Sequence, residues 1–282
     1  MIDLHTHTNE SDGSYTPAEL IDHAVALKLE ALAISDHDTF AGYDRAIRPA
    51  ADAGLDLVCA IELGARSTGP PRRTVHLLGY FLHKPPSSEF RAWLDELLAS
   101  RRERNLRLIG KLQSMGVEIA LKDVEGIGRT LTGRPHFARV LVHKGYAANS
   151  EEAFRKYLGE SASAFVERQQ PDASMGIQQI LAGGGLPVLA HPGRLNIRDP
   201  EIEQHLISGL KDAGLRGIEV FHSDHQRSEI ERYDRLAKKY GLAMSGGSDF
   251  HGDAKPRISL GTGVDGNINV PKSILEKLRQ VQ

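Results

Sequence analysis

Short apolar runs alternate with amphipathic stretches along most of this chain, and this alternation constrains the fold more than any other feature. Each run has four to eight residues, as expected for strands buried on both faces. Repeated strand–helix alternation favours a parallel sheet, and seven such units favour an α/β fold closed into a distorted (β/α)7 barrel. The predicted strands are 2–5, 31–35, 56–62, 74–81, 187–191, 216–221 and 242–246. The predicted helices are 17–28, 42–53, 172–183, 199–213, 225–240 and 271–280.

One long segment interrupts this pattern. After Pro85-Pro86-Ser87-Ser88, the periodicity predicts a charged helix over 89–115 and shorter helices over 135–144 and 150–158, with no strand. We therefore predict a barrel domain from residues 1–85 and 169–282, and a helical insertion, residues 86–168, that covers the active site. The run Arg101-Arg102-Glu103-Arg104 is expected on a solvated helix face, with contact to RNA as the alternative interpretation.

Composition excludes several classes of protein. The 282 residues carry a formal net charge of -2, so any anion-binding site must be local rather than part of a basic surface. The single cysteine, Cys59, lies in an apolar run and is expected to be a small buried side chain, which excludes an intrachain disulfide framework. With no signal-peptide pattern and no run of about 20 apolar residues, we expect a soluble cytoplasmic protein with no membrane partner.

Histidines and carboxylates gather at the ends of the predicted strands. His5 and His7 follow the first run, and because side chains alternate along a strand, they project together like two nitrogen ligands of one metal. Active sites of barrels lie at the carboxyl ends of the strands. His76 departs from this rule because it comes early in its run, so we expect either a strand that ends near it or a loop folded over the site. The candidate metal ligands are His5, His7, Asp12, His37, Glu62, His76, His191, Asp249 and His251.

This set of ligands indicates the kind of metal site. Imidazole and carboxylate without thiolate suit Mn²⁺, Zn²⁺ or Fe²⁺ better than a closed structural zinc site. Nine ligands are too many for one ion, and the two oxygens of Glu62 allow it to bridge two ions. The positive charge of the divalent ions exceeds the negative charge of the carboxylate ligands. This excess favours a dianionic substrate attacked by metal-activated water.

These motifs resemble those of the PHP (polymerase and histidinol phosphatase) family of metal-dependent phosphoesterases, which have amidohydrolase-like barrels. The resemblance implies two or three ions, with manganese expected and zinc or iron as alternatives. It also implies that His5, His7, Glu62 and Asp249 hold one ion, that Glu62, His76 and His191 hold a second, and that Asp12, His37 and His251 hold a third. The motifs that carry it are His5-x-His7, Asp12, Ser35-Asp36-His37, Glu62, His76, His191-Pro192-Gly193-Arg194 and Asp249-x-His251.

Within that family, the chain is most similar to 3′,5′-nucleoside bisphosphate phosphatases, some of which look like 5′-to-3′ exoribonucleases. The segment Thr132-Gly133-Arg134-Pro135-His136-Phe137-Ala138 and the residue Arg194 carry this resemblance. It implies a small nucleotide substrate that loses its 3′-phosphate. Guanidinium groups bind phosphate through two parallel hydrogen bonds, so Arg134 and Arg194 are the expected phosphate clamps. The other predicted substrate-binding residues are Asp12, Ser35, Pro135 and His136.

Several alternatives stay open at this point. Asp36 and His225 are candidates for the acid that protonates the leaving oxygen, and orientation of neighbouring groups is the alternative role for each. The substrate is alternatively short RNA cut from its 5′ end, or another small metabolite such as histidinol phosphate. A non-catalytic PHP module is the alternative from another class, and the complete ligand set argues against it. The sequence leaves the oligomeric state open.

Overall fold

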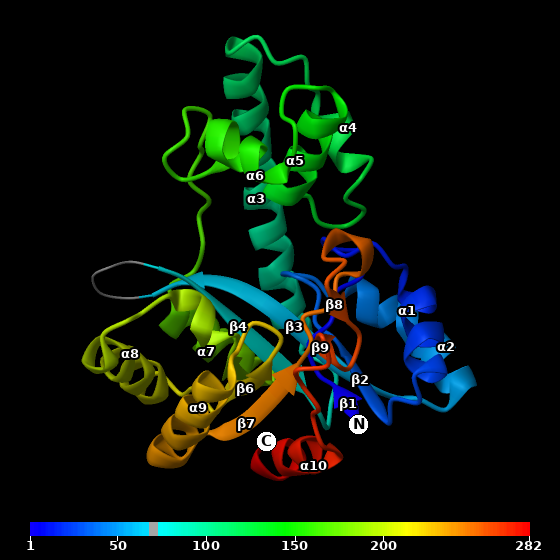
Figure 1. Ribbon diagram of the computed structural model, residues 1–282, viewed down its shortest axis with the longest axis vertical. Helices are drawn as coiled ribbons and strands as arrows, with labels where there is room; N and C mark the ends of the chain where they lie inside the picture. The colour runs from blue at the N-terminus through cyan, green and yellow to red at the C-terminus, as the bar shows by residue number, and fades with distance from the viewer. Residues whose placement is uncertain (68–72) are drawn as a thin grey trace.

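The computed structural model describes residues 1–67 and 73–282, and its centre is a sheet of seven strands in chain order (Figure 1). Every predicted strand is present within about four residues of its predicted ends, and the predicted α/β barrel is confirmed. The strands are β1 (Ile2–Asp3), β2 (Ala31–Ile34), β3 (Asp56–Arg66), β4 (Thr74–Phe81), β5 (Leu186–Leu189), β6 (Gly217–His222) and β7 (Ala243–Gly247).

The sheet closes where the chain segment after β1 meets the segment around β7. The Leu4 amide donates to the Gly246 carbonyl at 3.2 Å, and the Asp249 amide donates to the His5 carbonyl at 2.8 Å. The His7 amide donates to the Phe250 carbonyl at 2.9 Å. These bonds bring residues from the two ends of the chain side by side, so the first predicted ligands lie next to the last ones.

The direction of β4 differs from the prediction. β4 runs antiparallel to both β3 and β5, whereas the pairs β1–β2, β2–β3, β5–β6 and β6–β7 are parallel. The expectation of a parallel sheet is therefore wrong at this strand. The antiparallel direction of β4 explains the early position of His76 in its strand. His76 pairs in register with Gly64 near the carboxyl end of β3. His76 lies inside β4, so neither predicted account of it is right: the start of an antiparallel strand lies at the same edge as the ends of its parallel neighbours.

Alternation along the strands separates the barrel interior from its outer layer. In β3, Val58 and Ala60 belong to the core inside the barrel, and Glu62 shares their face, whereas Ile61 and Leu63 pack against the surrounding helices. Helix α10 (Lys272–Val281) contributes Ile274, Leu275 and Leu278 to the interior core and closes one end of the barrel. The other end is left for the polar side chains.

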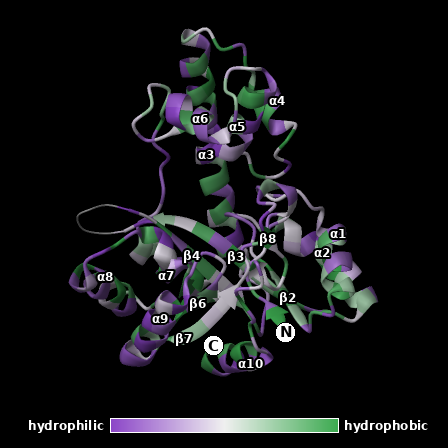
Figure 2. Cartoon of the chain, viewed as in Figure 1, coloured by the Kyte–Doolittle hydropathy of each residue, from purple (hydrophilic) through white to green (hydrophobic). Residues whose placement is uncertain are grey.

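Amphipathic helices surround the barrel where the sequence predicts them. Helix α1 begins as expected, with Thr16 and Glu19 forming a capping box around Pro17. Figure 2 shows polar and apolar residues mixed along the helices around the sheet, as expected for amphipathic helices. These helices are α1 (Pro17–Ala26), α2 (Ala41–Ala53), α7 (Ala173–Ala182), α8 (Pro200–Asp212) and α9 (Arg227–Tyr240). Among the described helices, none is both long enough and apolar enough to cross a membrane.

Between β4 and α7 the described chain is helical and stands above the barrel (Figure 1). Its own core includes Leu112, Val124, Phe137, Leu141 and Leu158. The short helix α4 was not predicted, and the division of the chain into two domains at residues 86 and 168 stays a prediction. The elements are α3 (Ser88–Ser114), α4 (Leu121–Glu125), α5 (Arg134–His143), α6 (Ser150–Ala153) and the π-helical turn η1 (Phe154–Leu158).

The arginine-rich run of α3 is not a solvated face. Arg101 and Arg104 are buried, whereas Arg102 and Arg107 are exposed. Residues three apart lie on one face of a helix, so Arg101 and Arg104 project together toward the barrel. The expectation of a solvated face is wrong because this face of α3 turns inward, where Arg101 reaches Asp38 of the barrel and Arg104 lies near Arg168.

The β1–β7 closure generates a stability prediction at Gly247. A Cβ at this position would lie 2.5 Å from the Cβ of His5, so a side chain would force the two segments apart. We expect Gly247→Ala to lower the free energy of unfolding by about 1–3 kcal/mol, as measured by urea denaturation.

Gly110 is the matched control, because it lies in α3 and a Cβ there meets open space. Gly110→Ala should raise the free energy of unfolding by about 0.5–1 kcal/mol. Equal stability of Gly247→Ala and the unsubstituted protein would contradict the tight closure.

Candidate metal centre and substrate pocket

Nine side chains converge at the open end of the barrel, and they are the nine predicted metal ligands. They come from β3, β4 and the segments that follow β1, β2, β5 and β7. The connections to these segments are short, so the barrel itself fixes the spacing. Three groups of them place ligand atoms within 4.8 Å of one another: His5, His7, Glu62 and Asp249; His37, Glu62 and His76; and His7, Asp12, His37 and His251.

Glu62 is central to the site. Its Oε1 lies 2.7 Å from His76 Nδ1 and 2.7 Å from His191 Nε2. Its Oε2 lies 3.1 Å from His7 Nε2 and 3.2 Å from His37 Nδ1. Burial alone would raise the pKa of this carboxyl, but the surrounding imidazoles outweigh burial and hold its pKa well below the usual range. Nε2 of His5 also lies 3.3 Å from Oε2, so the two oxygens together face five imidazole nitrogens. This arrangement fits a carboxylate that would give one oxygen to each of two ions.

Asp249 faces the Nε2 atoms of His5 and His7, which follow β1. Its Oδ1 lies 3.3 Å from His7 Nε2 and 3.5 Å from His5 Nε2. Its backbone φ is 58°, a left-handed conformation that is costly for a residue other than glycine. The hydrogen bond from its amide to His5 holds this conformation and aims the carboxylate at the two histidines.

A third group lies around Asp12, in the loop that follows β1. His251 Nε2 is 3.2 Å from Asp12 Oδ1, and His37 Nε2 is 3.7 Å from Asp12 Oδ2. Asp12, His37 and His251 are the residues that the family resemblance assigned to a third ion, and the structure brings them together.

The unpaired atoms show that these residues fit divalent metal ions. The Nε2 atoms of His5 and His7 are buried and make no hydrogen bond within residues 1–67 and 73–282, although carboxylate oxygens of Glu62 and Asp249 lie 3.1–3.5 Å away. Burial disfavours the charged form of His5, but Glu219 and Glu62 outweigh it and raise the pKa of His5 well above the usual range. Buried polar atoms seldom lack partners, and carboxylates aimed at unpaired imidazole nitrogens are the environment of a cation.

Sequence reasoning missed Glu219, which lies beneath the ligands on β6. Its Oε1 lies 2.9 Å from His5 Nδ1, and its Oε2 accepts the His191 amide at 2.7 Å. Burial opposes its charge, but His5 and His222 outweigh burial and lower the pKa of Glu219 to about 2. With Nδ1 of His5 bonded to Glu219, Nε2 is left to face the site. The available signal was an acidic residue inside the apolar run 217–221.

The two candidate acids lie outside the pocket. Asp36 accepts hydrogen bonds from the Thr8 amide at 2.8 Å, the Thr8 hydroxyl at 2.6 Å and the Ser11 hydroxyl at 2.6 Å. These contacts favour its alternative role, which is to hold the loop that carries Asp12. His225 has its Nδ1 2.9 Å from the Val220 carbonyl, and its Nε2 accepts the Gly193 amide at 3.3 Å. Its contacts also favour the alternative role.

Two predicted substrate residues are likewise engaged elsewhere. The buried Ser35 hydroxyl donates to the Thr6 carbonyl at 3.1 Å. Arg194 pairs through NH2 with Asp249 Oδ2 at 2.7 Å and through Nε with Asp224 Oδ2 at 2.6 Å. Because both sides of its guanidinium are occupied by carboxylates, Arg194 orients Asp249 in this structure and is not among the pocket-lining residues.

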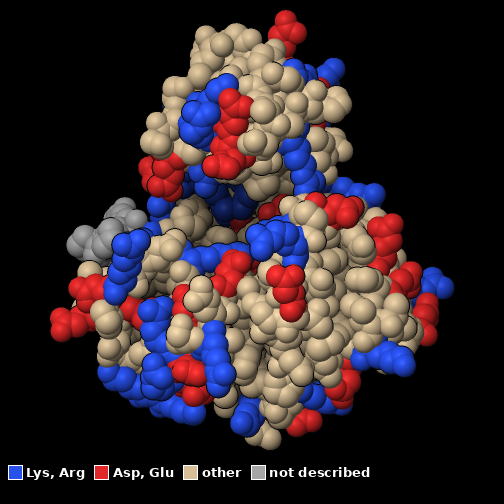
Figure 3. All heavy atoms as spheres, viewed as in Figure 1, with Lys and Arg blue, Asp and Glu red and all other residues tan. Residues whose placement is uncertain are grey.

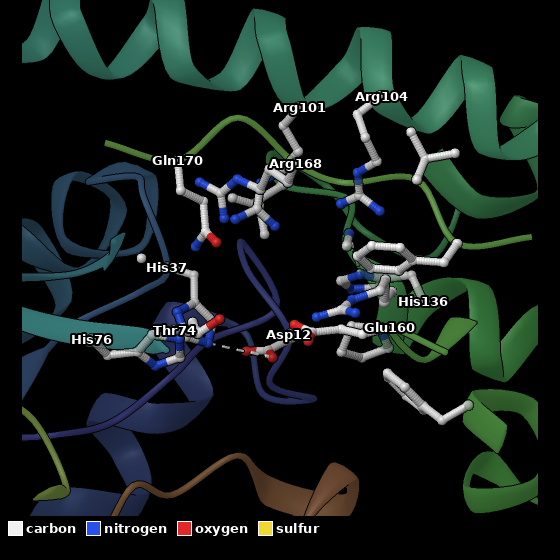
Figure 4. Close-up of a pocket in the computed structure, with 18 of the residues that line it drawn as sticks. Asp12, His37, Thr74, His76, Arg101, Arg104, His136, Glu160, Arg168 and Gln170 are labelled. Atoms are coloured by element: carbon white, nitrogen blue, oxygen red, sulfur yellow. Dashed lines mark hydrogen bonds and ion pairs between the residues drawn. The ribbon is translucent and has the colours of Figure 1, made fainter. Parts of the chain in front are cut away.

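A pocket lies between the candidate metal ligands and the helical segment above them. Figure 3 shows the corresponding hollow, with Lys and Arg side chains around it. Figure 4 shows Asp12, His37 and His76 on one side of the pocket and Arg101, Arg104 and Arg168 on the other. Arg134, Pro135 and His136, which the sequence predicted to bind substrate, also line it, together with Phe154 and Phe165.

The arginines of this pocket have too few counter-charges. Arg104 is 3% exposed, and no carboxylate lies within ion-pair distance of it in the part of the chain that the structure describes. Burial, together with the charges of Arg101 and Arg168, lowers the pKa of Arg104 to about 9. A buried cation that is repelled by its neighbours gains stability from an anion, so this wall of the pocket favours a phosphate group.

Comparisons with known proteins identify the family of this chain. The family model of the PHP domain matches residues 3–181. A 5′-3′ exoribonuclease of Haemophilus influenzae is 34% identical over 88% of this chain and 89% of its own length. A 3′,5′-nucleoside bisphosphate phosphatase of Chromobacterium violaceum is 34% identical over 89% of this chain and 87% of its own. A crystal structure from Bifidobacterium adolescentis, assigned as a metal-dependent phosphoesterase, superposes with a TM-score of 0.84 and 29% identity over 98% of this chain and 94% of its own.

The position of Glu219 generates a prediction about metal affinity. Glu219→Gln keeps the size of the side chain but removes the charge that orients His5, so we expect the affinity for Mn²⁺ to fall about 10–100-fold. Competition with a chelator of known affinity measures this change.

Glu203→Gln is the matched control, because Glu203 is a buried carboxylate on α8 that pairs with Arg232 far from these ligands. It should bind Mn²⁺ as the unsubstituted protein does. If Glu219→Gln also retained the original affinity, Glu219 would have no part in orienting the ligand.

Proposed function

This chain belongs to the PHP domain family of metal-dependent phosphoesterases, and from that premise we propose that it removes the 3′-phosphate of nucleoside 3′,5′-bisphosphates. The products would be a nucleoside 5′-monophosphate and inorganic phosphate. One observation carries the proposal: a single pocket has candidate metal ligands on one wall and arginines with too few counter-charges on the other. A substrate with two phosphates would satisfy both walls at once.

The metal wall would receive the phosphate that is cleaved. The nine ligands would hold two or three divalent ions, and manganese fits their imidazole and carboxylate atoms, with zinc or iron as alternatives. When bound, such ions supply positive charge for the phosphoryl oxygens and lower the pKa of water. The residues of the chain set the geometry: Glu62 spaces the imidazoles, Asp249 faces His5 and His7, and Asp36 holds the loop of Asp12.

The arginine wall would hold the phosphate that is retained. Arg104, on α3, has no counter-charge among the described residues. Arg134, at the start of α5, lies near it. The Arg134 guanidinium carbon lies 5.7 Å from the centre of the Phe165 ring and 6.0 Å from that of Phe154, which keeps this side chain in place. Arg104 and Arg134 would therefore form fixed hydrogen-bond donors for the 5′-phosphate.

The relative named as an exoribonuclease supports a second candidate substrate, short RNA that is degraded from its 5′ end. The observation that favours it is the open pocket, which reaches the surface between the barrel and the helical segment (Figure 3). The non-catalytic module is disfavoured, because the candidate ligand set is complete and the buried Nε2 atoms of His5 and His7 have no hydrogen-bond partner among the described residues.

The test is a comparison of substrates with the manganese-loaded protein. We expect kcat/KM for adenosine 3′,5′-bisphosphate to exceed that for adenosine 5′-monophosphate and histidinol phosphate by about 100-fold, because only the first substrate uses both walls. Chelation of the metal should abolish release of inorganic phosphate, and added Mn²⁺ should restore it.

A higher kcat/KM for short RNA, with turnover that falls steeply as salt is raised, would instead support the exoribonuclease, because several backbone phosphates would then be bound. Preference for histidinol phosphate would contradict both nucleotide proposals. Failure to bind or use any divalent metal would leave only the non-catalytic module.

A further inference from the structure

Asp38, which follows the candidate ligand His37, occupies an unusual position. It is 1% exposed and has a φ of 51°, in the left-handed region that is costly for aspartate. Its amide donates to the Glu62 carbonyl at 3.1 Å, and its Oδ1 accepts the Gly64 amide at 3.0 Å. The backbone and one carboxylate oxygen are thus fixed to β3, the strand that carries Glu62.

The other oxygen of Asp38 reaches two arginines of the pocket. Oδ2 accepts a hydrogen bond from Arg168 NH2 at 2.5 Å and another from Arg101 NH2. Arg101 comes from α3, where the chain leaves the barrel, and Arg168 lies in the segment that leads back to it. One buried carboxylate oxygen therefore joins both arms of the helical segment to the metal end of the barrel.

These two ion pairs leave each guanidinium with donors to spare. A guanidinium has five N–H groups, and each of these arginines uses one on Asp38. The Nε atoms of Arg101 and Arg168 are buried without a hydrogen-bond partner in residues 1–67 and 73–282, as is the Nε of Arg104. Both paired arginines line the pocket beside Arg104. Asp38 thus holds Arg101 and Arg168 in place without neutralising the group of three.

A purely structural connection between α3 and the barrel exists elsewhere. Arg91 of α3 pairs with Asp44 of α2 through two hydrogen bonds of 2.8 Å and 2.9 Å, and both side chains are about one-third exposed or more. Neither residue lines the pocket of Arg101 and Arg168. Attachment of the helical segment therefore does not by itself account for a buried, strained aspartate that faces two pocket arginines.

We propose that Asp38 is a positioning residue that holds Arg101 and Arg168 over the pocket, so that with Arg104 they bind the retained phosphate of a doubly phosphorylated substrate. This proposal rests on the proposed function for the identity of the substrate, but the anion site itself does not depend on which phosphoester is cleaved. Through Asp38, selection for a second phosphate is built onto the strand that carries the bridging Glu62.

The test replaces Asp38 by asparagine, which keeps its shape and removes its charge. Without that charge, Arg101 and Arg168 would repel each other and move apart. We expect KM for adenosine 3′,5′-bisphosphate to rise about 10–100-fold while kcat falls less than about threefold. The ratio of kcat/KM for this substrate to that for p-nitrophenyl phosphate, which has one phosphate, should fall by about the same factor as KM rises.

Asp44→Asn is the matched control, because it removes an ion pair between the same helix and the barrel outside the pocket. It should leave that ratio unchanged. Equal losses by Asp38→Asn on both substrates, or a loss of bound manganese in step with activity, would show a structural role and overturn the proposal. Unchanged kinetics would overturn it as well.

A second measurement separates this proposal from the proposed function. Inorganic sulfate should raise the unfolding temperature of the manganese-loaded protein. Asp38→Asn should need about 10-fold more sulfate for the same rise, whereas Asp44→Asn should need the same sulfate concentration as the unsubstituted protein. This result would support the anion site even if the nucleotide were not the substrate. Equal sulfate dependence in both variants would overturn the proposal. Should Asp38→Asn not fold, Arg168→Gln takes its place in both measurements, with the same expected results.

Discussion

The buried carboxylate of Glu62 is the interaction on which the rest of the site depends. A negative charge this deep in a barrel is costly unless cations or hydrogen-bond donors surround it. Five imidazoles from four different segments approach its two oxygens at 2.7–3.3 Å. Two features of the fold supply this arrangement. Closure of the barrel between the segments around β1 and β7 brings the two ends of the chain together. The antiparallel direction of β4 brings His76 to the same edge as the other candidate ligands.

The helical segment adds the opposite charge. Four arginines lie across the pocket from the candidate metal ligands: Arg101, Arg104, Arg134 and Arg168. Their positive charge exceeds the negative charge of the carboxylate that pairs with Arg101 and Arg168. Such a wall favours an anion, whereas the wall of imidazoles and carboxylates favours cations. The barrel thus carries the candidate metal ligands expected of a PHP domain phosphoesterase, and in the proposed function the helical segment would account for the choice among phosphoesters.

Much of this arrangement could be predicted from the sequence, and the exceptions have physical causes. Periodicity located the strands, and the position of histidines and carboxylates at strand ends predicted nine candidate ligands that the structure brings to one end of the barrel. Strand direction could not be read, because the alternation of side chains is the same for a parallel and an antiparallel strand, and so His76 looked misplaced. The burial of Arg101 and Arg104 could not be read either, because only tertiary contacts distinguish a helix face over the barrel from one in water. Arg194 looked like a phosphate clamp until Asp249 and Asp224 were found on both sides of its guanidinium.

The central claim is that metals and a second phosphate occupy opposite walls of one pocket. A crystal structure with Mn²⁺ and adenosine 5′-monophosphate, recorded at the manganese absorption edge, tests it most directly. We expect anomalous peaks within coordination distance of Glu62, and we expect the phosphate of the nucleotide to contact Arg104. Absence of manganese beside Glu62 would contradict the metal site. A nucleotide phosphate bound away from the arginines, while manganese and inorganic phosphate occupy the metal wall, would contradict the site for the second phosphate.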